Sequence, residues 1–157
     1  PAGRRHEMGH TFSRILLHVI FSTKARRNSL YAGMRGDLLA YLHGIVRNER
    51  AQIISANAVE DHVHLLLAVK PVHAPSDLVR KIKANSSRWI HDKYPNLHDF
   101  AWQSGFGVFS VSESATDDVT AYIREQERHH RRLPFAEELR LFLEKHSVDY
   151  DPEHYLD

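Results

Sequence analysis

The residues with the clearest chemical potential are two histidines in the run HVHLLLAV at positions 62–69. This short, apolar run predicts a buried strand, in which side chains alternate between the two faces. The apolar residues that begin with Val63 would share a face that covers a core. His62 and His64 would share the opposite face, about 7 Å apart along the strand. Two imidazoles at that spacing can bind one metal ion, although such pairs in strands often serve only packing.

A tyrosine further along the chain could supply a nucleophile to the same site. Tyr122 and Gln126 are four residues apart in the stretch YIREQ, and a helix would place them on one face about one turn apart. Two imidazoles, an amide oxygen and a phenol can form a metal site with an attached nucleophile. The same spacing fits a helix on which Tyr122 is half-buried beside Val119 and Ile123, and the residues alone do not decide between the two interpretations.

Two further residues could support the histidines. Asp61 lies in a tight turn between a strand predicted at 51–59 and the strand that carries the histidines, which favours an antiparallel hairpin. Its carboxylate could orient His62, because a ligating imidazole usually donates its other N–H to a partner. Asp61 could equally be only a turn residue. His18, in a strand predicted at 14–22, is more typical of a hydrogen-bonded core histidine than of a ligand.

Four motifs together resemble the single-tyrosine HUH transposases of small bacterial and archaeal insertion sequences and, more distantly, the repeat-associated tyrosine transposases. The resemblance runs from about Thr11 to the C-terminus. The motifs are LLHVIFSTKARR near the start, DHVHLLL around the histidines, WQSGFGVFSVSES, and YIREQERHH around the tyrosine. The combination is specific, whereas no single motif would be.

This resemblance implies an enzyme that cuts and rejoins single-stranded DNA near hairpins at the ends of an insertion sequence. It implies a 5′-phosphotyrosine intermediate, a free 3′-OH, and a homodimer in which the tyrosine helix of one subunit can serve the metal site of the other. By motif match, Tyr122 is the nucleophile, and His62, His64 and Gln126 are the metal ligands. The implied ion is magnesium or manganese, and the imidazole ligands favour manganese because they are softer than magnesium prefers.

The elements that must position these residues follow one another as strand, helix, strand, strand, helix, strand and two helices. This order predicts an α+β fold, a ferredoxin-like or RRM-like split β-α-β antiparallel sheet with helices on one face, plus C-terminal helices that carry the tyrosine. The histidines would then point from an open sheet face. The predicted ranges are 14–22, 31–48, 51–59, 62–69, 76–92 with Ser76 as its N-cap, 106–113, 117–131 and 135–146.

Length and composition bound the class of protein. The chain has 157 residues, of which 42% are hydrophobic and 26% charged, as expected for one soluble domain with one core. We expect residues 1–10 to be a disordered extension or an expression remnant, and residues 11–157 to form the single domain. The absence of cysteine excludes disulfides and a thiolate zinc cluster, and it fits a reducing cytoplasm. No apolar run is long enough to span a bilayer, and no secretory signal is visible.

The net charge of +1 is unevenly distributed. Residues 1–50 carry nine Lys/Arg against three Asp/Glu, whereas residues 101–157 carry six against twelve. A basic N-terminal part could bind a polyanion, although a solvated surface explains the charges equally well. The candidate DNA contacts lie in a predicted loop and on one predicted helix. They are Lys24, Arg26 and Arg27 in the loop, and Arg80, Lys81, Lys83 and Arg88 on the helix.

Other functions remain open from the residues alone. One is a non-catalytic nucleic-acid-binding module on the same open-sheet plan, but RNA-recognition domains of that kind carry aromatic residues where this strand carries histidines. Another is a metal-dependent hydrolase in which water attacks instead of Tyr122. A third is a domesticated HUH endonuclease that acts on repeat hairpins. A covalent protein–DNA adduct would separate the tyrosine enzymes from the first two.

Overall fold

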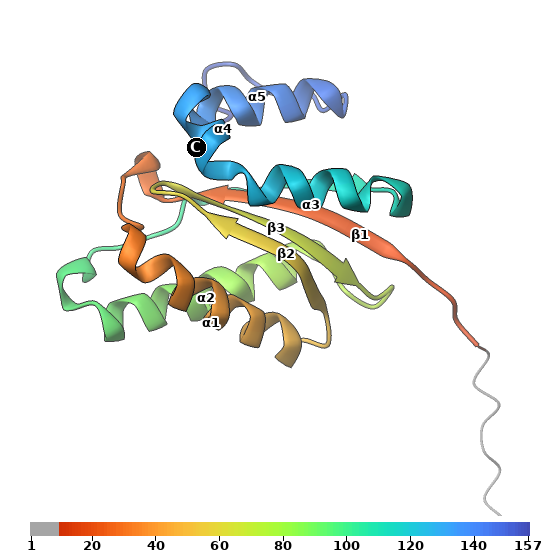
Figure 1. The fold of residues 1–157 in the computed structure, drawn as a ribbon, viewed down its shortest axis with the longest axis horizontal. Helices are drawn as coiled ribbons and strands as arrows, with labels where there is room; N and C mark the ends of the chain where they lie inside the picture. Colours follow the sequence, from red (N-terminus) through yellow and green to blue (C-terminus); the bar gives the residue numbers. More distant parts are fainter. Residues whose placement is uncertain (1–9) are drawn as a thin grey trace, which may run out of the picture.

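The computed structural model describes residues 10–157, which form a four-stranded antiparallel sheet with helices on both faces (Figure 1). The extension expected over residues 1–10 lies outside the described residues except for its last residue. The sheet has the order β2-β3-β1-β4. The strands are β1 (Ile15–Ser22), β2 (Gln52–Ala58), β3 (His62–Val69) and β4 (Gly107–Val111).

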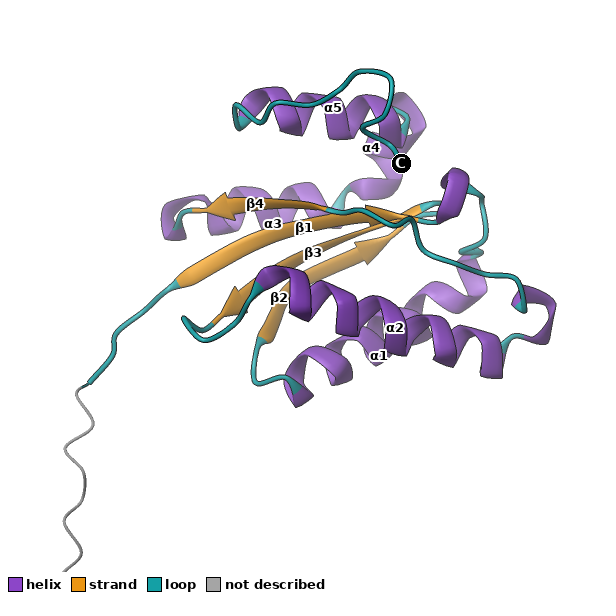
Figure 2. Ribbon diagram, turned by 180° about the vertical axis from the view of Figure 1, so that it is seen from behind, coloured by secondary structure: helices purple, strands orange, loops and turns teal. Residues whose placement is uncertain are grey.

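Two helices lie against one face of the sheet, and three lie over the other (Figures 1 and 2). The first pair is α1 (Ala32–Asn48) and α2 (Pro75–Lys93). The second group is α3 (Thr116–Arg124), α4 (Gln126–Arg132) and α5 (Phe135–Lys145). Three short 3-10 turns are η1 (Lys24–Arg26), η2 (Pro95–Leu97) and η3 (Glu113–Ala115). None of the helices in the described part of the chain is long and apolar enough to cross a bilayer.

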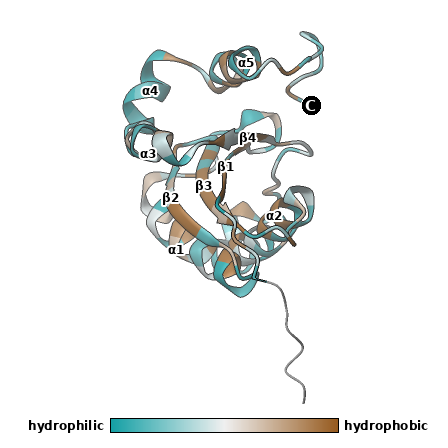
Figure 3. Ribbon diagram, turned by 90° about the vertical axis from the view of Figure 1, so that its right-hand side faces the viewer, coloured by the Kyte–Doolittle hydropathy of each residue, from teal (hydrophilic) through white to brown (hydrophobic). Residues whose placement is uncertain are grey.

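The alternation predicted for the two central strands is confirmed. Val19 and Phe21 of β1, with Val63 and Leu65 of β3, are fully buried in the core beneath α1 and α2. Burial of each such side chain contributes about 1.5–3 kcal/mol, so this core holds the sheet in place. In Figure 3 the central strands are largely brown, while α4 is mostly teal. The sheet is therefore a rigid base for whatever its opposite face carries.

The opposite face of the sheet is covered, and the expectation that it would be open is wrong. Leu16 and Leu66 pack against Ile123 of α3 in a second cluster. Ile20 packs against Phe135 and other apolar residues of α5 in a third. The physical reason is that this face of β1 and β3 is apolar beyond the histidines, so it must be buried against another element. The C-terminal helices supply that cover.

Two helix boundaries also differ from the predictions. The helix expected over 117–131 is interrupted at Glu125, whose backbone dihedrals (φ −93°, ψ 19°) separate α3 from α4. The N-cap of α2 is Ala74 rather than Ser76, because Pro75 takes the first helical position. Proline is well suited there, since its fixed φ is helical and its missing N–H would have no partner in any case.

The hairpin predicted between β2 and β3 is confirmed, and it brings the start of β3 beside the end of β1. Ser22 pairs with His62, and the next residue along, Thr23, donates its backbone N–H to the Asp61 carbonyl oxygen at 2.8 Å. The η1 turn follows directly. His62 and the basic loop that begins at Lys24 therefore lie at the same end of the sheet.

Candidate metal and nucleophile site

Strand β3 and the helices α4 and α5 bring four metal-binding groups together above the sheet. β3 presents His62 and His64, as its alternation predicts, and α4 presents Gln126 at its first residue. The fourth group, Glu138 of α5, was not predicted. All four residues are at most 2% exposed. The structure thus brings together the three predicted ligands and adds a carboxylate.

The donor atoms converge on one small volume. Glu138 Oε1 lies 3.1 Å from His62 Nε2 and 2.9 Å from His64 Nε2. Gln126 Oε1 lies 3.2 Å from His62 Nε2. The ligating atoms of His62, His64 and Glu138 all lie within 4.8 Å of one another.

This arrangement fits a divalent ion of the implied kind. Adjacent ligands of an octahedral ion with bonds of about 2.1 Å are about 3 Å apart, which matches the distances from His62 to Glu138, from His64 to Glu138 and from His62 to Gln126. Two imidazole nitrogens with amide and carboxylate oxygens also form a donor set that suits manganese and that magnesium tolerates. The residues present therefore fit the metal that the resemblance implies.

Each histidine is oriented by a second residue on its far side. Asp61 Oδ1 lies 2.7 Å from His62 Nδ1, so the carboxylate contact considered for this turn residue is present. His18 Nε2 lies 2.8 Å from His64 Nδ1, and His18 is 2% exposed. His18 is thus a hydrogen-bonded core histidine, as expected, but its partner is a candidate ligand. Partners of this kind fix the ring orientation and point Nε2 toward the ion.

The two candidate ligand histidines have different protonation states without a metal. Burial lowers the pKa of His62, but the carboxylates of Asp61 and Glu138 outweigh it and raise that pKa to about 9. Burial lowers the pKa of His64, which is therefore neutral at pH 7. For Glu138, burial is again opposed, and hydrogen bonds from both histidines hold its pKa well below the usual range. A cationic imidazole thus already compensates part of the buried negative charge.

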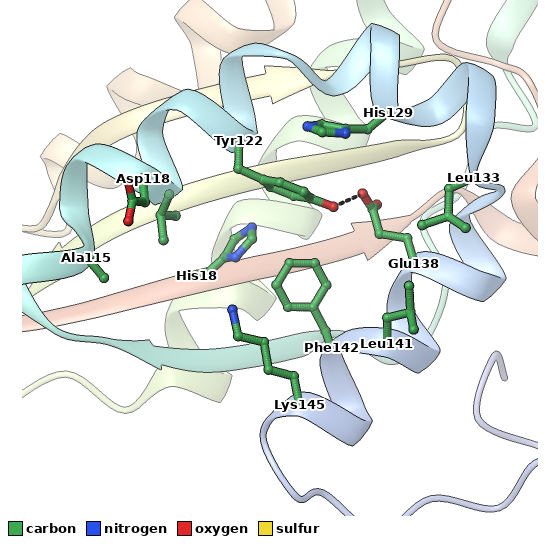
Figure 4. A pocket seen from close by; sticks show the side chains of 11 residues that line it. His18, Ala115, Asp118, Tyr122, His129, Leu133, Glu138, Leu141, Phe142 and Lys145 are labelled. Carbon is green, nitrogen blue, oxygen red and sulfur yellow. Dashed lines mark hydrogen bonds between the residues drawn. The ribbon is translucent and has the colours of Figure 1, made fainter.

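Tyr122 stands next to this cluster within the same chain. Its hydroxyl donates a hydrogen bond to Glu138 Oε2, as Figure 4 shows. Its ring stacks on His129 with the centroids 4.5 Å apart. Burial and the negative charge of Glu138 raise the pKa of the phenol, so the free tyrosine is neutral. Activation of this oxygen therefore requires positive charge beside it.

A cavity of about 490 Å³ opens beside the phenol (Figure 4). Tyr122, Glu138 and His18 are among its lining residues. Its apolar wall includes Phe142 and Leu141. The cavity gives a ligand access to the tyrosine side of the site, whereas His62, His64 and Gln126 do not line it.

The cations predicted to contact DNA fall into two groups on different parts of the molecule. Lys24, Arg26 and Arg27 lie in and just after η1, at the end of the sheet that carries His62. Lys24 and Arg27 are exposed. This group begins beside the turn that precedes His62, because Thr23 donates its backbone N–H to the Asp61 carbonyl oxygen. DNA contact by these residues stays a prediction.

The cations of α2 lie on the other side of the sheet from the histidines (Figure 2). Lys81 pairs with Glu49 at 2.9 Å, and Arg80 lies 3.9 Å from Asp77. Lys83 donates to the carbonyl oxygens of Gln103 at 2.9 Å and Gly105 at 2.5 Å. Burial lowers the pKa of Lys83 to about 8, so it remains mainly cationic at pH 7. Arg88 is exposed. The structure does not bring these residues to the site, and DNA contact by them stays a prediction.

Sequence reasoning missed two contributors to the site, although one left a signal. Glu138 lies between Phe135 and Leu139 on the apolar side of its helix, and an acidic residue on a buried stripe is unusual enough to suggest a function. His130 Nε2 of α4 lies 3.6 Å from Asp61 Oδ1, and its ring centroid is 5.2 Å from that of His62. Its position depends on the break at Glu125, which no local pattern indicated.

Comparison with known proteins identifies similar chains. The family model described as "Transposase IS200 like" matches residues 11–126. The ISDra2 transposase TnpA of Deinococcus radiodurans is 29% identical over 114 residues, which cover 69% of this chain and 81% of that protein. The transposase for insertion sequence element IS200 of Salmonella typhimurium is 25% identical over 130 residues, which cover 79% of this chain and 84% of the relative.

Two solved structures are similar in fold. A putative transposase from Deinococcus radiodurans superposes with a TM-score of 0.63 at 27% identity, over 75% of this chain and 95% of that one. A REP-associated tyrosine transposase bound to a REP hairpin superposes with a TM-score of 0.59 at 16% identity, over 79% of this chain and 73% of that one. The α+β architecture with an antiparallel sheet is common to all three chains.

Proposed function

This chain belongs to the IS200-like transposase family, and from that premise we propose that it cuts and rejoins single-stranded DNA at the ends of an insertion sequence. The observation that carries this proposal is the convergence of Tyr122 with His62, His64 and Gln126 at one buried site. A phenol beside a set of metal ligands is the minimum that a tyrosine-dependent phosphoryl transfer needs. The decisive experiment is a search for a covalent adduct between the protein and DNA.

In the proposed reaction Tyr122 Oη attacks the scissile phosphorus. The phosphorus–O3′ bond breaks, the 3′ oxygen takes up a proton and becomes a free hydroxyl, and the DNA stays attached to the tyrosine through its 5′-phosphate. The phenol proton leaves along its hydrogen bond to Glu138 Oε2 and passes on to water in the adjoining cavity, because the pKa of Glu138 is too low for it to keep the proton. Attack by a 3′-OH of another strand reverses these steps and rejoins DNA. The phosphotyrosine keeps the free energy of the phosphodiester, so nucleotide hydrolysis is not required.

His62, His64 and Gln126 would hold the divalent ion, with Asp61 and His18 fixing the two imidazole rings. The ion supplies positive charge that polarises a phosphoryl oxygen and offsets the charge that develops there. The protein contributes the rest by position, because the sheet and the helices hold the phenol and the imidazoles in a fixed relation. We propose magnesium or manganese for this role, and the two imidazoles favour manganese.

The proposed substrate is hairpin-bearing single-stranded DNA. The REP-associated transposase that shares this fold was solved bound to a REP hairpin, which supports a hairpin for this chain as well. Lys24, Arg26 and Arg27 supply phosphate contacts at the end of the sheet beside His62. Arg80 and Arg88 of α2 are exposed on the other side of the sheet, where only a longer substrate would reach them.

We expect the double variant Lys24→Gln/Arg27→Gln to weaken binding of a short single strand that spans the cleavage site. Each bound phosphate releases counterions, so the slope of log affinity against log salt should become shallower by about 0.7 for each phosphate that the variant no longer binds. Fluorescence anisotropy at several salt concentrations measures this slope. Arg80→Gln/Arg88→Gln is the matched control for the short strand and should weaken binding only of a full hairpin. An unchanged slope in the first variant would contradict the proposed contact.

We also propose that the protein is a homodimer, and light scattering should give twice the mass of the chain. Mixing a Tyr122→Phe chain with a His64→Ala chain then tests whether subunits share sites. Recovered cleavage means that the tyrosine of one subunit serves the metal ligands of the other. In the structure Tyr122 and His64 meet within one chain, so no recovery is expected unless α3 exchanges between subunits. A monomeric mass with and without DNA would contradict the dimer.

A further inference from the structure

We infer that Glu138 is a fourth ligand of the metal ion and the residue that positions Tyr122 beside it. This inference rests on the proposed function and extends it to helix α5. Glu138 lies twelve residues beyond Gln126, where the match to the family model ends. Neither the sequence motifs nor the family match assigns this residue a role.

The first argument is the position of the carboxylate. Glu138 Oε1 is within 3.1 Å of both candidate imidazole nitrogens. When those Nε2 atoms coordinate a cation, they present lone pairs and no longer donate hydrogen bonds. A carboxylate oxygen held against two lone pairs in a buried site would then be repelled and would lose both donors. Coordination of the same cation by Glu138 removes that conflict without moving the helix.

The second argument is the chemistry of the ligands. Magnesium and manganese prefer oxygen ligands, and carboxylates most of all. His62, His64 and Gln126 would supply only neutral groups to the ion. Glu138 is the one carboxylate among the described residues that contacts both histidines. Its negative charge would raise the affinity of this otherwise neutral set of ligands for the divalent ion.

The third argument is the hydrogen bond between Glu138 and the proposed nucleophile, Tyr122. The two oxygens of Glu138 face different partners, because Oε1 faces the histidines and Oε2 accepts the hydrogen bond from Tyr122. A ligand used in this way fixes the distance between the phenol oxygen and the ion. Helix α5 can hold it rigidly, since the neighbouring Phe135 is 1% exposed and packs with Ile20 of the sheet.

The test is direct titration of the full-length chain with Mn²⁺ in the absence of DNA, followed by electron paramagnetic resonance of the free ion. Glu138→Gln keeps the size of the side chain and removes its charge. We expect its Mn²⁺ dissociation constant to rise at least tenfold, as loss of a metal-site partner typically costs ten- to a hundredfold. Glu137→Gln is the matched control, because Glu137 pairs with Arg140 away from the site, and its affinity should equal that of the unaltered chain.

The positioning role has its own measurement. Even at saturating Mn²⁺, Glu138→Ala should form the adduct more slowly than Glu138→Gln. Only glutamine keeps an oxygen that can accept the hydrogen bond from Tyr122. Circular dichroism of each variant reports whether α5 and the sheet remain folded. If Glu138→Gln is destabilised, Glu138→Asp retains the charge with a shorter side chain, and its affinity should lie between those of glutamate and glutamine.

Two outcomes would overturn the inference, and they are distinguishable. If the unaltered chain binds Mn²⁺ and Glu138→Gln binds it equally well or more tightly, Glu138 is no ligand and the proposed function is unaffected. If the unaltered chain binds no Mn²⁺ and cleaves DNA in the presence of a chelator, the metal site itself is wrong, and this inference fails with it.

Discussion

A Tyr122→Phe chain should bind hairpin DNA with unchanged affinity and form no covalent adduct. The substitution removes one oxygen and little volume, so the stacking on His129 and the cover of the sheet are retained. The oxygen it removes is the one that bonds to phosphorus in the proposed reaction. The unaltered chain, incubated with end-labelled hairpin DNA and manganese, should give an adduct that survives a denaturing gel. Peptide mapping should place the DNA on Tyr122 through a 5′-phosphate.

Tyr41→Phe provides the matched control for this experiment. Tyr41 is 37% exposed and stacks on Trp89, on the face of the sheet that lies away from the histidines. Loss of its hydroxyl should leave adduct formation unchanged. An adduct mapped to another tyrosine, or undiminished cleavage by Tyr122→Phe, would show that the nucleophile has been assigned to the wrong residue.

Replacement of His64 by alanine should abolish cleavage at every manganese concentration tested. The change removes one proposed ligand and breaks hydrogen bonds to His18 and Glu138 at the centre of the site. Leaving buried partners unsatisfied costs about 1–3 kcal/mol of stability, which a folded domain can bear. We therefore expect a lower melting temperature, a native circular dichroism spectrum, and retained DNA binding.

The control for that variant is His43→Ala, because His43 is an exposed histidine on α1. It should cleave DNA at the rate of the unaltered chain, and that cleavage should stop when EDTA is added. Full activity of His64→Ala, or activity of the unaltered chain in EDTA, would show that the proposed metal site is not the one that cleaves DNA.

The parts of the fold that depend on local patterns could be predicted from the sequence. The bounds of β3 agree with the apolar run at 62–69, and the alternation along β1 placed Val19 and Phe21 in the main core. Such patterns arise from neighbouring residues in the chain, so they are visible without a structure. The same reasoning placed His62 and His64 on one face of the strand.

The parts that depend on long-range packing could not be predicted in this way. Glu138 meets His64 across 74 positions of sequence, and only the packing of α5 over the sheet creates that contact. The i, i+4 relation of Tyr122 and Gln126 predicted a shared helix face, but the helix is interrupted at Glu125 between them. Gln126 still reaches His62, because α4 begins at that residue and directs it toward the sheet.

The burial of the donor atoms has a kinetic consequence. The side chains of His62, His64 and Gln126 are at most 1% exposed, and the cavity beside Tyr122 meets the site at the phenol, Glu138 and His18. A hydrated ion must shed water and pass these side chains before it can be bound. Loading and unloading of the ion should therefore be slow compared with diffusion.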